Sequence, residues 1–159
     1  MKNNIGMTDT ATREVAKLLT KLLADEFVLY TKTRNAHWNV EGHDFHTVHL
    51  FFESQYQQLE EIVDTVAERI RTLGHYAVGT LKGMLELTHL TETTRAKNDS
   101  GGFIRELLED HSSIVEYIRM NIKSTADQYE DFGTSDFITG LIKTHEKLTW
   151  MLAAHLKNN

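Results

Sequence analysis

The sequence of 159 residues contains neither cysteine nor proline. Without cysteine, disulfides, thiolate metal sites and cysteine nucleophiles are all excluded. Without proline, no helix is interrupted by a residue that lacks its N–H, which favours long helices over a turn-rich β fold. No apolar run approaches the length of a membrane span, and the N-terminal residues lack the apolar segment of a signal peptide. We therefore expect a cytoplasmic protein with no membrane partner.

Basic residues are fewer than acidic ones, 17 against 23, so the net charge is −6. An acidic balance argues against a surface that is basic overall, although a local basic patch must still be looked for. The length fits a single domain that can bury a real core. We assign residues 1–7 to a short flexible tail and 8–159 to the domain.

Four segments show the apolar spacing of amphipathic helices, over about 8–39, 44–73, 100–127 and 135–156. Thr8 or Asp9 can cap the first, and Gly74 is well placed to end the second. The connection over 75–99 is long and could hold a short helix capped by Thr80. This pattern predicts an all-α, ferritin-like four-helix bundle with a short extra helix in the crossover between helices 2 and 3.

The second helix carries a polar stripe beside its apolar one. At 100° per residue the stripe falls on one face, and it consists of His49, Glu53, Glu60, Asp64 and Glu68. Carboxylates at this spacing repel one another, and a cation among them would relieve the repulsion. A solvated polar face explains the stripe about equally well on pattern alone.

The spacing of this stripe decides how a metal could be shared. Asp64 lies about 22 Å along the helix from His49, so one chain cannot bring both to one ion. The numbers of Glu53 and Asp64 add to 117, as do those of His49 and Glu68. Two antiparallel copies of the helix, related by a two-fold axis between positions 58 and 59, would therefore match both pairs at once. We expect metal sites between subunits, two in each dimer.

His37 ends the first helix, and a turn at Gly42 could fold the second helix back so that His37 lies near His49. Two imidazoles and three carboxylates form a nitrogen and oxygen donor set that suits iron or manganese, with zinc as a competitor. A site inside one ferritin-type chain uses two Glu-x-x-His motifs. Here the single example, Glu86 to His89, lies in the crossover, which argues against such a site.

The chain resembles the Dps family, the mini-ferritins named as DNA-binding proteins from starved cells. The resemblance rests on His37-Trp38-Asn39-Val40-x-Gly42, Phe45, Val48-His49, the run Asp64 to Arg69, and Leu73-Gly74, with "DFGTSD" and "HEKLTWMLAAHL" further on. It implies a hollow homododecamer with ferroxidase sites at its two-fold interfaces. His37, His49 and Glu53 would come from one subunit, with Asp64 and Glu68 from its mate. Many members have aspartate at the position of Glu53, so the resemblance leaves open whether Glu53 binds directly.

The implied reaction is oxidation of Fe²⁺ to Fe³⁺, preferably by H₂O₂, followed by storage of ferric oxide in the cavity and protection from oxidative damage. Trp38, beside His37, is either an oxidisable ring near the iron or a packing residue. The resemblance places Asp131 and Asp136 near a three-fold pore, where they could guide Fe²⁺. Capping of the fourth helix, which Asp136 in its first turn would serve, is an equal alternative. Glu60 and Glu61 are candidates for mineral nucleation.

The other histidines stand apart from this set. We expect His43 and His46 to be surface or loop residues, with an auxiliary role in metal binding as the alternative, and His111, His145 and His155 to be structural. Arg69 is expected to be an ion-pair partner.

DNA binding is the competing function that the family name suggests. The usual device is a lysine-rich flexible tail, whereas here Lys2 and Lys157 are the lysines of the two tails. A tail with one lysine binds the phosphates of DNA only weakly. We expect DNA binding to be weak or absent near neutral pH, and a nucleoid-protecting DNA binder remains the alternative. A bundle with a structural metal, or with zinc held for another purpose, is the third class.

Overall fold

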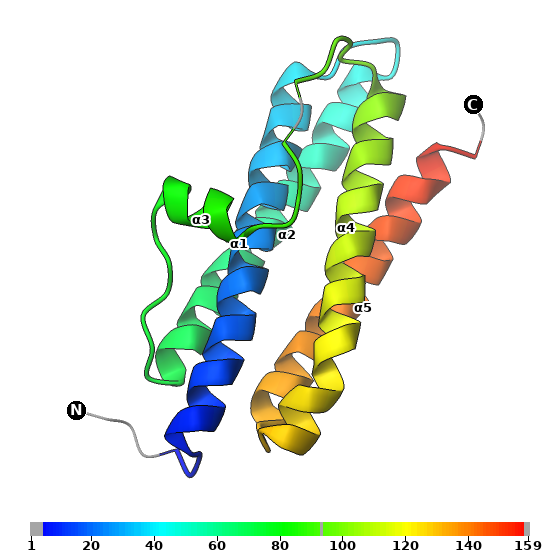
Figure 1. The fold of residues 1–159 in the computed structure, drawn as a ribbon. Helices are drawn as coiled ribbons and strands as arrows, with labels where there is room; N and C mark the ends of the chain where they lie inside the picture. Colours follow the sequence, from blue (N-terminus) through cyan, green and yellow to red (C-terminus); the bar gives the residue numbers. More distant parts are fainter. Residues whose placement is uncertain (1–4, 93, 158–159) are drawn as a thin grey trace.

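The computed structural model describes residues 5–92 and 94–157, so part of the tail expected over 1–7 lies outside the described residues. Four long helices, α1 (Asp9–Asn39), α2 (Phe45–Thr72), α4 (Ser100–Lys123) and α5 (Phe132–His155), form the bundle in Figure 1, and α3 (Leu81–Leu87) lies in the crossover from α2 to α4. A π-helical turn, η1 (Ser124–Gln128), follows α4. This confirms the all-α, ferritin-like bundle. In the described part of the chain no helix is long and apolar enough to cross a membrane.

The ends of the helices are set by local chemistry, mostly where the sequence predicts. The hydroxyl of Thr8 accepts a hydrogen bond from Ala11 N, and that of Thr80 accepts one from Gly83 N, each at 3.1 Å. Gly74, with φ at 88°, ends α2 in a conformation that favours glycine. The last helix begins at Phe132, three residues before the expected start at 135. The reason is the carboxylate of Asp131, which caps it by accepting from Thr134 N at 2.8 Å.

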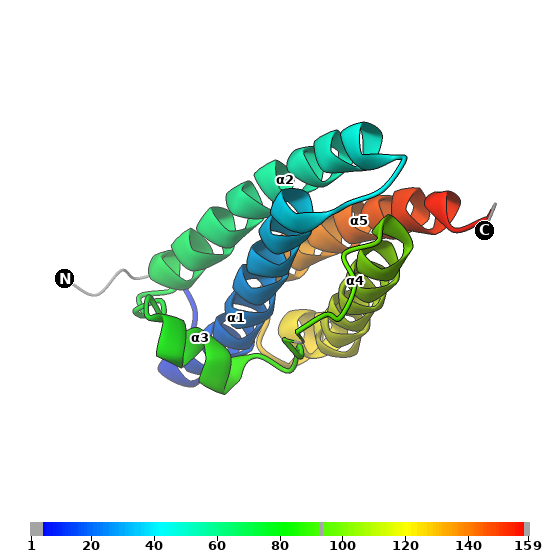
Figure 2. The ribbon, with the colours of Figure 1, turned by 90° about the horizontal axis from the view of Figure 1, so that it is seen from above.

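Seen from above in Figure 2, the four long helices lie side by side, and α3 lies outside α1. The buried side chains of the long helices form one hydrophobic core. Each long helix contributes fully buried side chains, among them Leu22, Phe52, Ile114 and Ile138. Full burial of a side chain of this size stabilises the fold by about 1.5–3 kcal/mol. The core therefore supplies the rigid frame on which polar side chains at the helix surfaces are held.

The turn between α1 and α2 is tied to the start of α4. Glu41 N donates to Asn98 O at 2.9 Å, and the Ser100 hydroxyl donates to the Asp44 carboxylate at 2.6 Å. Gly42, with φ at 133°, allows the sharp reversal between the two helices. The end of α1 is consequently fixed beside the first turns of α2, where the predicted histidine ligands lie.

Candidate metal centre

His37 and His49 form a stacked pair across α1 and α2. Their ring centroids are 3.8 Å apart and their planes differ by 19°. Nδ1 of His37 lies 2.8 Å from His49 O, and Nδ1 of His49 lies 2.8 Å from His37 O. A carbonyl oxygen only accepts, so both Nδ1 atoms must carry hydrogen. In the neutral rings both Nε2 atoms then hold the lone pair that a metal ion needs.

The end of α1 explains one of these two hydrogen bonds, the one that His49 donates to His37 O. His37 lies in the last turn of α1, where the final carbonyl groups lack partners within the helix. The ring of His49 satisfies one of these carbonyl groups and is oriented by it. The sequence predicts that the two histidines are close, but it does not predict that each would fix the tautomer of the other.

Aromatic and cationic side chains support the histidine pair. The ring of Tyr56 meets His37 edge-on at 5.2 Å, and Phe45 lies 5.1 Å from His49. The guanidinium of Arg34 lies 4.7 Å from the centre of the Tyr56 ring and 5.1 Å from that of Trp38. Trp38 itself is 63% exposed. In this chain Trp38 is therefore a surface ring stacked on a cation, and its redox role stays a prediction.

The carboxylates of the predicted set are separated along α2. Glu53 is half-buried one turn after His49, whereas Asp64 and Glu68 are exposed further along the helix. Within the described residues, no three His, Asp or Glu side chains are grouped so that they could hold a metal ion. One chain thus brings together His37 and His49, with Glu53 one turn further along α2, and it keeps Asp64 and Glu68 apart from them.

Asp131 and Asp136, the two predicted pore residues, differ in their surroundings. Asp131 is buried, and its carboxylate accepts from the Thr134 hydroxyl at 2.5 Å and from the Arg69 guanidinium at 3.0 Å. This confirms Arg69 as an ion-pair partner and assigns Asp131 to capping and pairing. Asp136 is exposed on α5. A pore role for either residue stays a prediction.

The remaining histidines behave as expected at the level of burial. His43 and His46 are exposed, and His155 stacks on Phe51 with ring centroids 4.4 Å apart. His111 and His145 are fully buried and contact one another. Their partner Glu26 was not predicted from the sequence, although a glutamate between Leu22 and Leu29 on the apolar face of a helix was a signal that could have found it.

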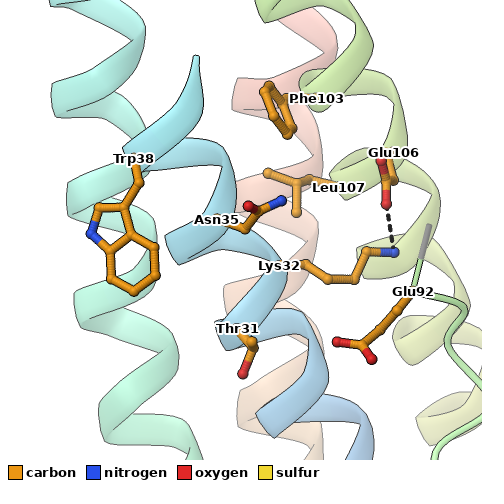
Figure 3. Close-up of a pocket in the computed structure, with 8 residues that line it drawn as sticks. All are labelled: Thr31, Lys32, Asn35, Trp38, Glu92, Phe103, Glu106 and Leu107. Atoms are coloured by element: carbon orange, nitrogen blue, oxygen red, sulfur yellow. Dashed lines mark ion pairs between the residues drawn. The ribbon is translucent and has the colours of Figure 1, made fainter. Parts of the chain in front are cut away.

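A pocket of about 280 Å³ between α1, α4 and the crossover is a separate feature, shown in Figure 3. Its buried ammonium group, on Lys32, contacts Glu106 at 3.0 Å, Asp110 at 2.5 Å and Thr91 O at 2.7 Å. Burial raises the pKa of Asp110, and the bond to Lys32 opposes this. The ammonium group of Lys32 is already paired with acceptors on α4 and in the crossover, so these contacts hold the crossover against the bundle. The pocket therefore offers no site for a metal ion.

Known proteins resemble this chain over nearly its whole length. Residues 16–159 match the family model of the ferritin-like domain. A DNA protection during starvation protein from Helicobacter pylori is 35% identical over 140 residues, which cover 88% of this chain and 96% of the relative. An uncharacterized low-temperature-induced protein from Nostoc is 38% identical, covering 97% and 86% of the two chains.

Solved structures agree with these sequence matches. The Dps protein from Vibrio cholerae, described as one of the ferritin-like diiron-carboxylate proteins, superposes with a TM-score of 0.91 at 34% identity. That superposition covers 99% of this chain and 98% of the other. DpsC from Streptomyces coelicolor gives a TM-score of 0.95 at 28% identity, covering 100% and 92%.

Proposed function

This chain belongs to the Dps family of ferritin-like proteins, and from that premise we propose that it is a ferroxidase that oxidises Fe²⁺ with H₂O₂ and stores the ferric product. The family connection supports iron binding, iron storage and protection in general. The finer statement, peroxide-dependent oxidation at sites between subunits of a homododecamer, is our proposal. The observation that carries it is the stacked pair of His37 and His49, whose Nδ1 atoms are both occupied by carbonyl groups.

The donor set fits iron as a substrate. His37 and His49 offer two neutral imidazole nitrogens, Glu53 adds a carboxylate one helical turn away, and Asp64 and Glu68 would add two more from the two-fold mate. Imidazole and carboxylate together suit iron, and manganese or zinc can compete for the same donors. Negatively charged carboxylates bind Fe³⁺ more strongly than Fe²⁺, since its charge is higher, and this favours the oxidation.

The surface around Asp64 supports its place at an interface. Glu60 and Asp64 line a largely apolar pocket of about 400 Å³ that also includes Leu81 and Met84 of α3. Leu81 and Leu85 on the same short helix are exposed. Leucines exposed beside the carboxylate of Asp64 are better explained by contact with a second copy than by free solvent.

The proposed chemistry uses two iron ions per peroxide. Two Fe²⁺ ions each give one electron to H₂O₂, the O–O bond breaks, and two protons complete the products, two Fe³⁺ and two H₂O. Two ions at one site supply both electrons together, so no hydroxyl radical is released. In this proposal the residues of this chain supply imidazole and carboxylate ligands for both ions.

The test of this function is anaerobic loading with Fe²⁺ followed by H₂O₂, with ferric absorbance as the readout. The double variant Asp64→Ala with Glu68→Ala should oxidise iron at least tenfold more slowly than the parent. A matched control, Glu109→Ala with Glu116→Ala, removes two exposed carboxylates of α4 and should keep the parent rate. Equal rates for the parent and the Asp64 and Glu68 variant would refute the assignment.

DNA binding is the alternative function, and the family name alone favours it. We propose that it is weak or absent near neutral pH, because the net charge is −6 and the exposed Lys157 is the one described lysine of either tail. A clear shift of plasmid on a gel at neutral pH and physiological salt would contradict this.

A further inference from the structure

Three ionisable side chains form a chain of contacts in the middle of the bundle, sealed from solvent. They are Glu26 on α1, His111 on α4 and His145 on α5, and each is 0% exposed. Nε2 of His145 lies 2.8 Å from the Glu26 carboxylate, and Nδ1 of His145 lies 2.8 Å from Nδ1 of His111. None of the three contacts the proposed iron ligands in the described structure.

The contacts limit how many hydrogens the two imidazoles can carry. The contact between the two Nδ1 atoms holds one hydrogen, because an N–H must face a lone pair. Two neutral imidazoles carry two N–H hydrogens in all, and two imidazolium rings carry four. With one position kept as a lone pair, the pair is limited to three hydrogens, which is one positive charge.

Among the described residues, no acceptor faces the ring nitrogen of His111 that a second charge would use. Nε2 of His111 and the second oxygen of Glu26 are buried and have no hydrogen-bond partner among the described residues. The pKa of His111 is held well below its ordinary value, first by burial and then by the charge of His145.

Among the described residues, the other elements packed around the cluster bring no unpaired charge to it. On α4 the neighbouring Asp110 is paired with Lys32 of α1. On α1, Asp25 is paired with Lys21 and contacts His89 of the crossover. The buried face of α2, all of it within the described residues, carries no ionisable side chain, and the buried residue of α3 is Met84.

We propose that Glu26, His145 and His111 form an acid-sensitive lock that joins α5 to α1 and α4. The folded pair of imidazoles accepts one positive charge, whereas the unfolded chain accepts two as the pH falls below about 6.5. Below that pH the unfolded state binds one more proton than the folded state. From this cluster alone, the unfolding equilibrium constant therefore rises about tenfold for each unit by which the pH falls. The stability that this cluster contributes is present above about pH 6.5 and is lost as the pH falls below that value. The lock is independent of iron chemistry.

The first test compares the parent with His111→Leu, which leaves the pair of Glu26 and His145 intact. Denaturant unfolding is followed by helical circular dichroism at one fixed protein concentration, from pH 7.5 to 4.5. The ratio of unfolding constants, parent over variant, should rise about tenfold per pH unit below 6.5. The same comparison with the exposed His46→Leu should show a constant ratio. A ratio for His111→Leu that stays within about twofold across the range would overturn the proposal.

A second measurement needs no variant and so remains decisive if His111→Leu fails to fold. Deuterium exchange at the C2 carbon of each histidine, read by mass spectrometry across pH, reports the protonation of individual rings in the assembled protein. His111 should show no midpoint between pH 5 and 8. A His111 midpoint near 6.5 would mean that the pair takes two charges, and the lock would be wrong.

Discussion

Replacing Asp131 separates its capping role from the proposed pore role. In Asp131→Ala, α5 loses the cap that Thr134 N uses, which costs about 1 kcal/mol. The variant also loses the charge-assisted hydrogen bond from Arg69, worth about 1.5–3 kcal/mol, with the low end fitting because Arg69 is partly exposed. We expect the free energy of unfolding to fall by about 2.5–4 kcal/mol in total.

The matched variant Asp131→Asn keeps an oxygen that can cap the helix but removes the charge that pairs with Arg69. Its loss of stability should be smaller, about 1–2 kcal/mol. Asp136→Asn, at an exposed position of the same helix, should stay within about 0.5 kcal/mol of the parent. All four proteins are compared by denaturant unfolding at one protein concentration, with helical circular dichroism as the signal.

The reasoning fails if Asp131→Ala unfolds at the same denaturant concentration as the parent. If that variant also took up Fe²⁺ more slowly, the pore role would replace the cap as the main role of Asp131.

Three further outcomes follow from named contacts. His49→Leu should slow peroxide-dependent ferric absorbance at least tenfold, whereas the exposed His43→Leu should leave it unchanged. Phe52→Ala, at a fully buried position, should lower the free energy of unfolding by about 3–5 kcal/mol in denaturant titrations. Burial and the charge of Asp25 raise the pKa of Tyr117 to about 12. The unfolded chain therefore releases this proton first, and Tyr117→Phe should lose less stability than the parent when the pH rises above about 10, as followed by ultraviolet absorbance and circular dichroism.

Much of the fold could be predicted because its determinants are local. Thr8, Thr80 and Gly74 act within one turn of their own positions, so sequence alone places three helix ends correctly. The start of α5 was placed too late because the cap at Asp131 belongs to a segment that reads as a loop. The π-helical turn after Lys123 has no such local signal and was not predicted.

In the candidate site, too, the local features could be predicted from the sequence and the contacts between distant segments could not. His37 and His49 are twelve positions apart across one turn, and their proximity follows from the length of that turn. Their mutual carbonyl bonds depend on the stagger of α1 against α2, which no sequence spacing fixes. His111 and His145 each look like an isolated structural histidine in the sequence, and their contact with Glu26 depends on three helices meeting in the core.

Mixing two defective chains in one oligomer tests the shared site most directly. One chain carries His37→Ala and His49→Ala, and the other carries Asp64→Ala and Glu68→Ala. Neither homo-oligomer should oxidise Fe²⁺ with H₂O₂ at the parent rate. In a hybrid dimer, one of the two sites would combine the two intact halves and the other site would combine the two defective halves.

With equal amounts and random pairing, half of the dimers are hybrids, so about one quarter of all sites should be restored. The mixed oligomer, co-expressed and purified through two different tags, should oxidise iron at about a quarter of the parent rate per chain. A mixed oligomer no faster than either defective protein alone would contradict a site built from two subunits.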